Sequence, residues 1–369
     1  MNFFKNIFIF ALFAVHPIMA SERYQIVDMG VLKHPSSEAS SINNLGQICG
    51  SYKDNGKSYL FIYDSKEKKN NYTEVKNTTR PIINDKSEIY GSYSKLKNEG
   101  VFEFDQESIY RWENPLSYFT YFNFTDLGYP DSQSQKYFEE KKRIVLWDVN
   151  DHRQTIVMNS VSIDNKWKVD NFKYKVWIHD NGNMQEITNP QFEAAIKINN
   201  NSQVMGCFFE EPPSKLNRKI PRISLYDLKT GKITVLQFTD AAFGNDLNDK
   251  DQIAGVYYDS AKSKIQGFLT DNANSDILPI DNFCPIALNN NSVIVGRFQD
   301  GEKKNKPAIW DNGCLNDLME VVDLVDDMGN IWESLDALID LNDEGYIIGN
   351  GTIHGQPHGF LLVPANHLH

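Results

Sequence analysis

The stretch "INNLGQICG", residues 42–50, recurs in altered form along the whole chain. Each copy has an apolar residue, then Asn and two or three turn-forming residues, then an alternating segment that ends at or near Gly. Because Asn, Asp, Gly and Ser tolerate turn conformations and bond to their own backbone, each copy predicts a tight β-hairpin. The seven copies are "INNLGQICG" at 42, "INDKSEIYG" at 83, "VNDHRQTIVMN" at 149, "INNNSQVMG" at 198, "LNDKDQIAG" at 247, "LNNNSVIVG" at 288 and "LNDEGYIIG" at 341.

The spacing of these copies predicts the architecture. Their asparagines stand 41 to 66 residues apart, which is the range of four-stranded propeller blades with insertions. Most copies are followed by two more strand-like segments, such as "YLFIYD" at 59 and "NYTEV" at 71, and no long amphipathic helix intervenes. We therefore expect an all-β chain that folds as a seven-bladed β-propeller of four-stranded blades. A six- or eight-bladed ring stays an alternative, since the copies at 83 and 149 are degenerate.

The last copy lacks a fourth strand, because the chain ends at "GFLLVPANHLH". The segment "RYQIVDMG" at 23 stands alone before the first copy and resembles a fourth strand. We predict that residues 24–30 pair with the strand at 358–363 and close the ring, which leaves no exposed sheet edge.

The N-terminus "MNFFKNIFIFALFAVHPIMA" has the layout of a signal peptide cleaved after Ala20, with an uncleaved N-terminal anchor as the alternative. Residues 21–369 would then form a single propeller domain, exported to the periplasm or the exterior. No later segment is long and apolar enough to span a membrane. The net charge of −12, near −13 after cleavage, argues against a nucleic-acid partner. We expect a monomer without a cofactor.

The four cysteines, Cys49, Cys207, Cys284 and Cys314, show no metal-binding spacing. Cys284 and Cys314 would begin the innermost and outermost strands of the sixth blade, three strand spacings of about 4.8 Å apart, which exceeds the reach of a disulfide. The sequence therefore predicts four free and mostly buried thiols.

The C-terminal stretch "LNDLMEVVDLVDDMGNIWESLDALIDLNDEGYIIGNGTIHGQPHGFLLVP" resembles the HAF repeat family of bacterial extracellular repeat proteins. His358, Gly359 and Phe360 stand where the name-giving triplet would, and Ala337, Asn342, Gly345 and Gly349 match the family's hairpin. The resemblance covers residues 23–364, but the second and third blades lack the first Gly of the hairpin. It implies export and a propeller-like fold, and it implies no established activity.

Three groups of residues are candidates for chemistry. Asp148, Asp246 and Asp340 precede the apolar residue of their hairpins and are expected to face the central tunnel, where they could hold a cation or pair with Lys197. His34, His354 and His358 could approach a zinc or copper ion if the ring closes as predicted, although packing or capping is the favoured role of His358. The repeated asparagines are interpreted as turn caps rather than calcium ligands, because no EF-type loop is present.

No motif for nucleophilic or metal-dependent catalysis occurs in the sequence. We expect a recognition module that binds a protein or a glycan, with a secreted hydrolase or lyase whose site is dispersed over several blades as the alternative. Long insertions at 129–142, 159–173, 209–221 and 319–336 would emerge on one face of the ring. They carry aromatic residues that could bind the ligand, Tyr137, Phe138, Trp167, Phe172 and Trp332. The alternative is that these rings pack on the blades, above all Trp332.

Overall fold

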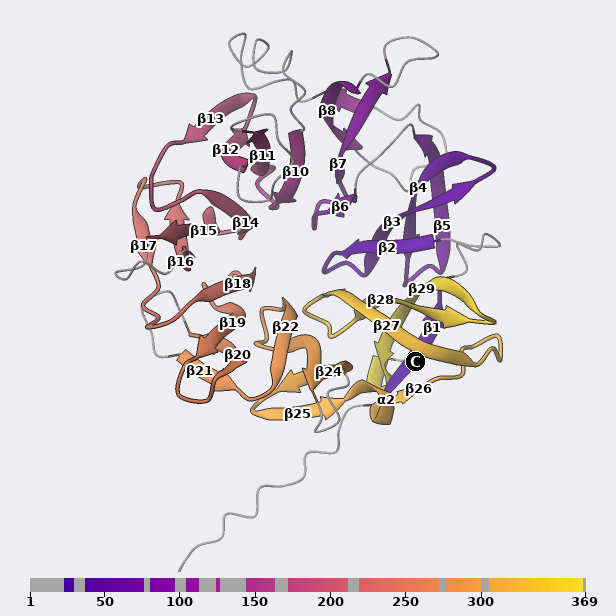
Figure 1. Cartoon of the computed structure of the whole chain (residues 1–369). Helices are drawn as coiled ribbons and strands as arrows, with labels where there is room; N and C mark the ends of the chain where they lie inside the picture. The colour runs from indigo at the N-terminus through magenta and orange to yellow at the C-terminus, as the bar shows by residue number, and fades with distance from the viewer. Residues whose placement is uncertain are drawn as a thin grey trace, which may run out of the picture.

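The computed structural model describes residues 23–29, 37–75, 80–96, 104–112, 124–126, 144–162, 172–211, 219–271, 277–299 and 305–367. The prediction of an all-β propeller is confirmed: antiparallel sheets are arranged around a central axis, and the first strand of each sheet is nearest the centre (Figure 1). The predicted signal peptide lies outside the described residues. No described helix is long and apolar enough to cross a membrane.

Six sheets contain four strands each, hydrogen-bonded in chain order. They are β2 (Ser37–Ile42), β3 (Gln47–Asp54), β4 (Lys57–Asp64) and β5 (Lys69–Val75); β6 (Ile82–Ile83), β7 (Ile89–Leu96), β8 (Phe104–Trp112) and β9 (Phe124–Asp126); β10 (Ile144–Val149), β11 (Thr155–Ser162), β12 (Phe172–Asp180) and β13 (Asn183–Ile187); β14 (Ala194–Ile198), β15 (Gln203–Glu210), β16 (Ile220–Asp227) and β17 (Ile233–Val235); β18 (Ala242–Leu247), β19 (Ile253–Asp259), β20 (Lys264–Thr270) and β21 (Ile277–Ile280); and β22 (Phe283–Leu288), β23 (Ile294–Gln299), β24 (Asn305–Asp311) and β25 (Cys314–Asp317).

A further sheet joins the two ends of the chain. It contains β27 (Trp332–Leu341), β28 (Ile347–Ile353), β29 (Gln356–Pro364), β1 (Tyr24–Asp28) and β26 (Val322–Asp323), in the order β26-β1-β29-β28-β27. Strand β1 is antiparallel to β29, with Tyr24 opposite Pro364 and Asp28 opposite Phe360. On its other edge β1 is parallel to β26, which follows the short helix α2 (Leu318–Val321). The sequence did not reveal this fifth strand.

The Gly that ends the repeated phrase marks a close approach of two strands. In β28, a Cβ on Gly349 would lie 2.3 Å from the backbone oxygen of Ala337 and 2.3 Å from the ring of Phe360. Real Cβ atoms do not come this close, so the position excludes a side chain. Gly50 and Gly255 meet a Phe of the third strand in the same way, whereas Gly206 and Gly296 meet a Phe that stands just before or at the start of the first strand. This contact explains both the Gly of the hairpin and the Phe of the HAF-like triplet.

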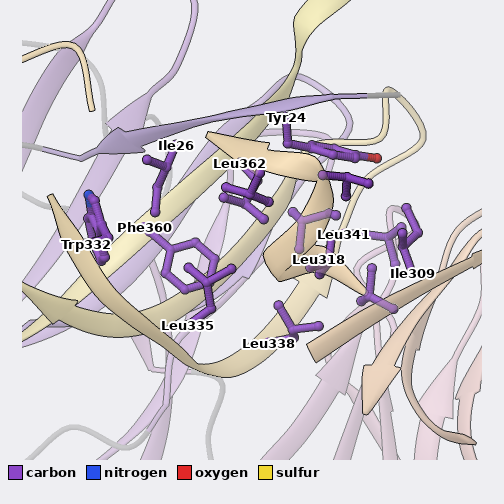
Figure 2. Packing of buried hydrophobic residues seen from close by; sticks show 14 of the residues in the cluster. Tyr24, Ile26, Ile309, Leu318, Trp332, Leu335, Leu338, Leu341, Phe360 and Leu362 are labelled. Atoms are coloured by element: carbon purple, nitrogen blue, oxygen red, sulfur yellow. The ribbon is translucent and has the colours of Figure 1, made fainter. Parts of the chain in front are cut away.

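The core is distributed between adjacent sheets. One cluster unites strands from the two ends of the chain with α2: Tyr24 and Ile26 of β1 pack with Trp332, Phe360 and Leu318, all of them buried (Figure 2). Since burial of apolar surface is the main favourable contribution to folding, these contacts hold β1 against the end of the chain.

The cysteines, all within the described residues, form no disulfide. Cys49 and Cys207 are buried as expected, whereas Cys284 and Cys314 are exposed. The prediction of mostly buried thiols is therefore correct for only half of them. Cys284 is the second residue of the first strand β22, and Cys314 begins the outermost strand β25.

Candidate functional site

The centre of the ring is built from the repeated turns. In each turn the Asn side chain caps the backbone: in the first, Asn43 Oδ1 accepts the N–H groups of Leu45 (3.1 Å) and Gln47 (2.8 Å). The residue three positions after each Asn has a positive φ, as in Gly46 (80°) and Ser87 (60°). The prediction that the asparagines are turn caps is thus confirmed.

The same asparagines also connect neighbouring sheets, which the sequence did not indicate. Each Asn Nδ2 donates to the backbone oxygen of the next repeat's Asn, at 2.9 to 3.5 Å, and Asn342 donates back to Asn43. All seven asparagines are buried. They are Asn43, Asn84, Asn150, Asn199, Asn248, Asn289 and Asn342; together we call them the Asn ring.

A second set of bonds runs parallel to the Asn ring. The residue after each Asn accepts, through Oδ1, the backbone N–H of the equivalent residue in the preceding repeat, at 2.7 to 2.9 Å. These residues, the Asx rim, are Asn44, Asp85, Asp151, Asn200, Asp249, Asn290 and Asp343. Asn200 and Asn290 also donate Nδ2 to the carboxylates on both sides. At this end of the channel, hydrogen bonds therefore connect each repeated turn to the next.

The predicted tunnel carboxylates, Asp148, Asp246 and Asp340, each stand two residues before an asparagine of the Asn ring. A β-bulge in the strand of each of these residues, at Leu146/Asp148 in β10, Gly244/Asp246 in β18 and Leu338/Asp340 in β27, places the Asp after the bulged residue. Each carboxylate accepts a backbone N–H from the neighbouring sheet: Asp148 from Ile198 (2.9 Å) and Asp246 from Leu288 (2.7 Å). Asp340 accepts one from Ile42 in the same way (3.2 Å).

Lys197 is the counter-ion of this layer. Its Nζ lies 3.6 Å from Asp246 Oδ1 and 3.9 Å from Asp148 Oδ1. Burial raises the pKa of Asp246 to about 6, although Lys197 opposes the shift, and it raises the pKa of Asp148. The carboxylates of Asp148 and then Asp246 raise the pKa of Lys197. The two carboxylates thus favour the protonated ammonium form of Lys197.

These groups surround a cavity of about 160 Å³ at the end of the channel. It is lined by seven carboxylates and one ammonium, Lys197. The described residues contain no group of three or more His, Cys, Asp or Glu side chains that could hold a metal ion. Because the carboxylates accept backbone N–H groups between sheets, this arrangement connects neighbouring sheets around the channel.

The histidines predicted to approach a metal are not brought together within the described residues. His354 lies in the exposed turn between β28 and β29, with φ 50°, and His34 falls outside the described residues. The ring of His358 packs edge-on to Trp332, with centroids 6.4 Å apart, and its Nδ1 is 3.9 Å from Asp28 Oδ2. This position agrees with the packing role expected for His358.

The prediction that Trp332 contacts a ligand is wrong. Trp332 begins β27, is 1% exposed and packs edge-on to Phe360, so it cannot contact an external ligand. Tyr137, Phe138 and Trp167 lie outside the described residues, as does the side chain of Phe172 at the start of β12. The insertions are also shorter than predicted, because residues 159–162 and 172–173 belong to β11 and β12.

Exposed aromatic side chains that the sequence did not single out lie at one end of the ring. In each sheet the loops after the second and fourth strands share one end, which we call the open face, opposite the repeated turns. Tyr174 and Phe243 stand near the start of β12 and β18, and Phe209 and Tyr258 near the end of β15 and β19. All four positions are near strand ends at the open face, and each side chain is 36 to 48% exposed. Periodicity did not reveal them, because alternation does not distinguish a rim from a buried blade face.

No family model matches the sequence, and no curated protein is similar to it in sequence. The structure is similar to an oligogalacturonate lyase from Vibrio parahaemolyticus, with 10% identity, 93% of this chain and 94% of that chain covered, and a TM-score of 0.57. It is also similar to the polysaccharide lyase Uly1 (9% identity, 90% of each chain, TM-score 0.53). An acylaminoacyl peptidase from Pyrococcus horikoshii matches over 86% of this chain with 11% identity and a TM-score of 0.52, and the chain spans half of that protein's length. At these identities the similarity shows the fold alone.

Proposed function

We propose that this chain is an exported, seven-bladed β-propeller that recognises a protein or a glycan through its open face. The pairing of β1 with β29, and the bond from Asn342 back to Asn43, support a ring of seven blades closed by the N-terminal strand. The resemblance to the HAF repeats and the signal-peptide layout support export. A rigid ring that carries long loops on one end is a common way to present a binding surface.

The observation that carries the proposal is the contrast between the two ends of the ring. At the end with the repeated turns, the polar side chains of the Asn ring and the Asx rim are hydrogen-bonded to one another's backbone. Among the described repeated turns, Leu45 is the large apolar side chain that is exposed. The open face presents Tyr174, Phe209, Phe243 and Tyr258. Large aromatic groups supply much of the energy of recognition, because they bury a large area with little conformational entropy to lose.

The alternative is a lyase or hydrolase, because similar folds occur in an oligogalacturonate lyase and a polysaccharide lyase, and both matches cover at least 90% of this chain. The channel cavity does not favour an anionic sugar polymer, since seven carboxylates and one ammonium would repel uronate groups. Turnover of oligogalacturonate, followed as unsaturated product and lost when an open-face residue is changed, would favour the enzyme.

The proposal is tested by a ligand screen on the mature chain, with glycan arrays and immobilised candidate proteins as probes. Phe209→Ser and Tyr258→Ser should each lower the affinity for any captured ligand by about tenfold, roughly 1.4 kcal/mol. The matched control is Leu45→Ser, an exposed apolar residue at 43% on the opposite end, which should bind like the unaltered chain. Binding that is lost only in Leu45→Ser would place recognition at the end with the repeated turns and contradict the proposal.

A further inference from the structure

A separate surface lies on the outer edge of the ring, in the connection between β25 and β27. Residues 324–332, which we call the edge hairpin, fold back on themselves: Trp332 N–H donates to Leu324 O (2.9 Å), and Asp326 N–H donates to Asn330 O (3.0 Å). Asp326 Oδ1 caps the turn by accepting the N–H groups of Met328 (3.0 Å) and Asn330 (2.8 Å). Gly329, with φ 83°, completes the turn. The hairpin is therefore an ordered element.

One side of this segment anchors it to the ring. Leu318 and Val321 of α2, Val322 of β26 and Trp332 are between 0 and 8% exposed and belong to the core cluster that holds β1 (Figure 2). Lys68, in the turn between β4 and β5, also approaches Asp327, with Nζ 3.8 Å from Oδ2. The apolar part of this anchor does not involve Val325, Met328 or Ile331.

The tip exposes apolar side chains to solvent. Val325 and Ile331 form an isolated antiparallel bridge and are 43% and 66% exposed, and Met328 in the turn is 71% exposed. Residues opposite one another on antiparallel strands have their Cβ atoms about 5 Å apart, so Val325 and Ile331 form one continuous surface beside Met328. Apolar side chains gathered on an anchored, protruding turn mark a site of contact.

The charge around the tip indicates which partner fits. Residues 317–336 contain seven carboxylates, Asp317, Glu320, Asp323, Asp326, Asp327, Glu333 and Asp336, and no Lys or Arg. Lys306 pairs with Asp317 (3.2 Å) and Lys68 with Asp327, whereas Glu320 and Asp323 have no ion pair among the described residues. An apolar centre with an acidic surround complements a segment that is both apolar and basic.

We propose that the edge hairpin is a docking surface for a basic amphipathic segment of another protein. Its exposed Met328 is a flexible, polarizable side chain that adapts to different apolar partners. A second copy of the chain, with a net charge of −12, and an anionic membrane would both be repelled by the carboxylates. The surface lies beside β26, the outermost strand of the sheet that contains β1.

The probe is a fluorescent synthetic helix of Leu and Lys, compared by anisotropy with a Ser and Lys peptide of equal charge. The unaltered chain should bind the Leu and Lys helix more tightly, and the double change Met328→Ser with Ile331→Ser should weaken this binding at least about tenfold. Glu320→Gln with Asp323→Asn should weaken it and reduce its dependence on salt. The matched control, Ile265→Ser, removes a 63% exposed apolar side chain from β20 and should change nothing.

Other outcomes would overturn the proposal. Equal affinity for the two peptides, or equal binding by the unaltered chain and the Met328/Ile331 variant, would mean that general charge attraction is the cause. Self-association in sedimentation that the same variant abolishes would identify a second copy as the occupant. Binding to phosphatidylcholine vesicles that the variant abolishes would identify a lipid surface instead.

Discussion

At the scale of single residues, Asp246 is one of the channel carboxyls whose burial makes stability depend on pH. Both of its oxygens accept backbone N–H groups, from Leu247 (2.9 Å) and Leu288 (2.7 Å), while burial raises its pKa to about 6 from an ordinary value of 3.8. Between these two values the folded chain holds a proton on Asp246 that the unfolded chain has lost. The contribution of Asp246 to the free energy of unfolding therefore falls as pH rises from about 4 to 6.

Asp246→Asn should remove this dependence. The unaltered chain should lose up to about 3 kcal/mol more unfolding free energy than the variant between pH 4 and pH 7.5, because the full charge is buried only above the raised pKa. Urea unfolding at several pH values measures the difference. The control is Glu211→Gln, with an exposed side chain, which should keep the slope of the unaltered chain. Parallel curves for the Asp246 variant and the unaltered chain would show that Asp246 is ionised throughout.

At the scale of elements, the repeated turn combines a local and a long-range function in one side chain. Asn289 Oδ1 accepts the N–H groups of Asn291 and Val293, both at 3.0 Å, and its Nδ2 donates to Asn342 O (3.0 Å) in the next repeat. Because the group is buried, its loss leaves partners that water cannot reach.

Asn289→Ala should lower the free energy of unfolding by roughly 2–5 kcal/mol, since three hydrogen bonds are lost and their partners stay buried. Asn291→Ala in the same turn is the matched control: its Nδ2 donates to Asp343 O (2.7 Å) at an exposed position, and its removal should cost less than about 1 kcal/mol. Thermal or urea unfolding of both variants gives the comparison. Equal losses would mean that the Asn ring adds little between blades.

The turns were predictable from the sequence because their chemistry is local: Asn bonds to its own backbone, and the pattern repeats. The pairing of the Asn ring across sheets was not, since it depends on the distance between residues 41 or more positions apart. Trp332 was misassigned as a ligand-binding residue for a related reason. It lies at the end of an insertion, but β26 and α2 of the same insertion return to the sheet and cover the region around it.

At the scale of the molecule, the all-β propeller was predictable, because seven copies of one hairpin imply repeated sheets around a common axis. The proposed binding surface was harder to predict from the sequence. Tyr174, Phe209, Phe243 and Tyr258 share one end of their sheets only through the order of strands, and the lengths of the loops did not identify them. The edge hairpin likewise depends on the parallel strand β26, which only two residue pairs define.

The distinction between the open face and the opposite end with the repeated turns depends on a closed ring. An open array of sheets would expose the edge of a sheet as a further surface. The direct test is thermal unfolding of a chain that begins at residue 32, with and without a synthetic peptide of residues 21–31. This chain lacks β1, so β29 and the core cluster around Trp332 and Phe360 lose their cover.

The account predicts that the shortened chain unfolds at a markedly lower temperature or aggregates, and that the peptide restores much of the lost stability by pairing with β29. A peptide in which Ile26 is changed to Asp should fail to restore it, because Ile26 is fully buried. A shortened chain that melts like the mature protein, without the peptide, would contradict closure of the ring by the N-terminal strand.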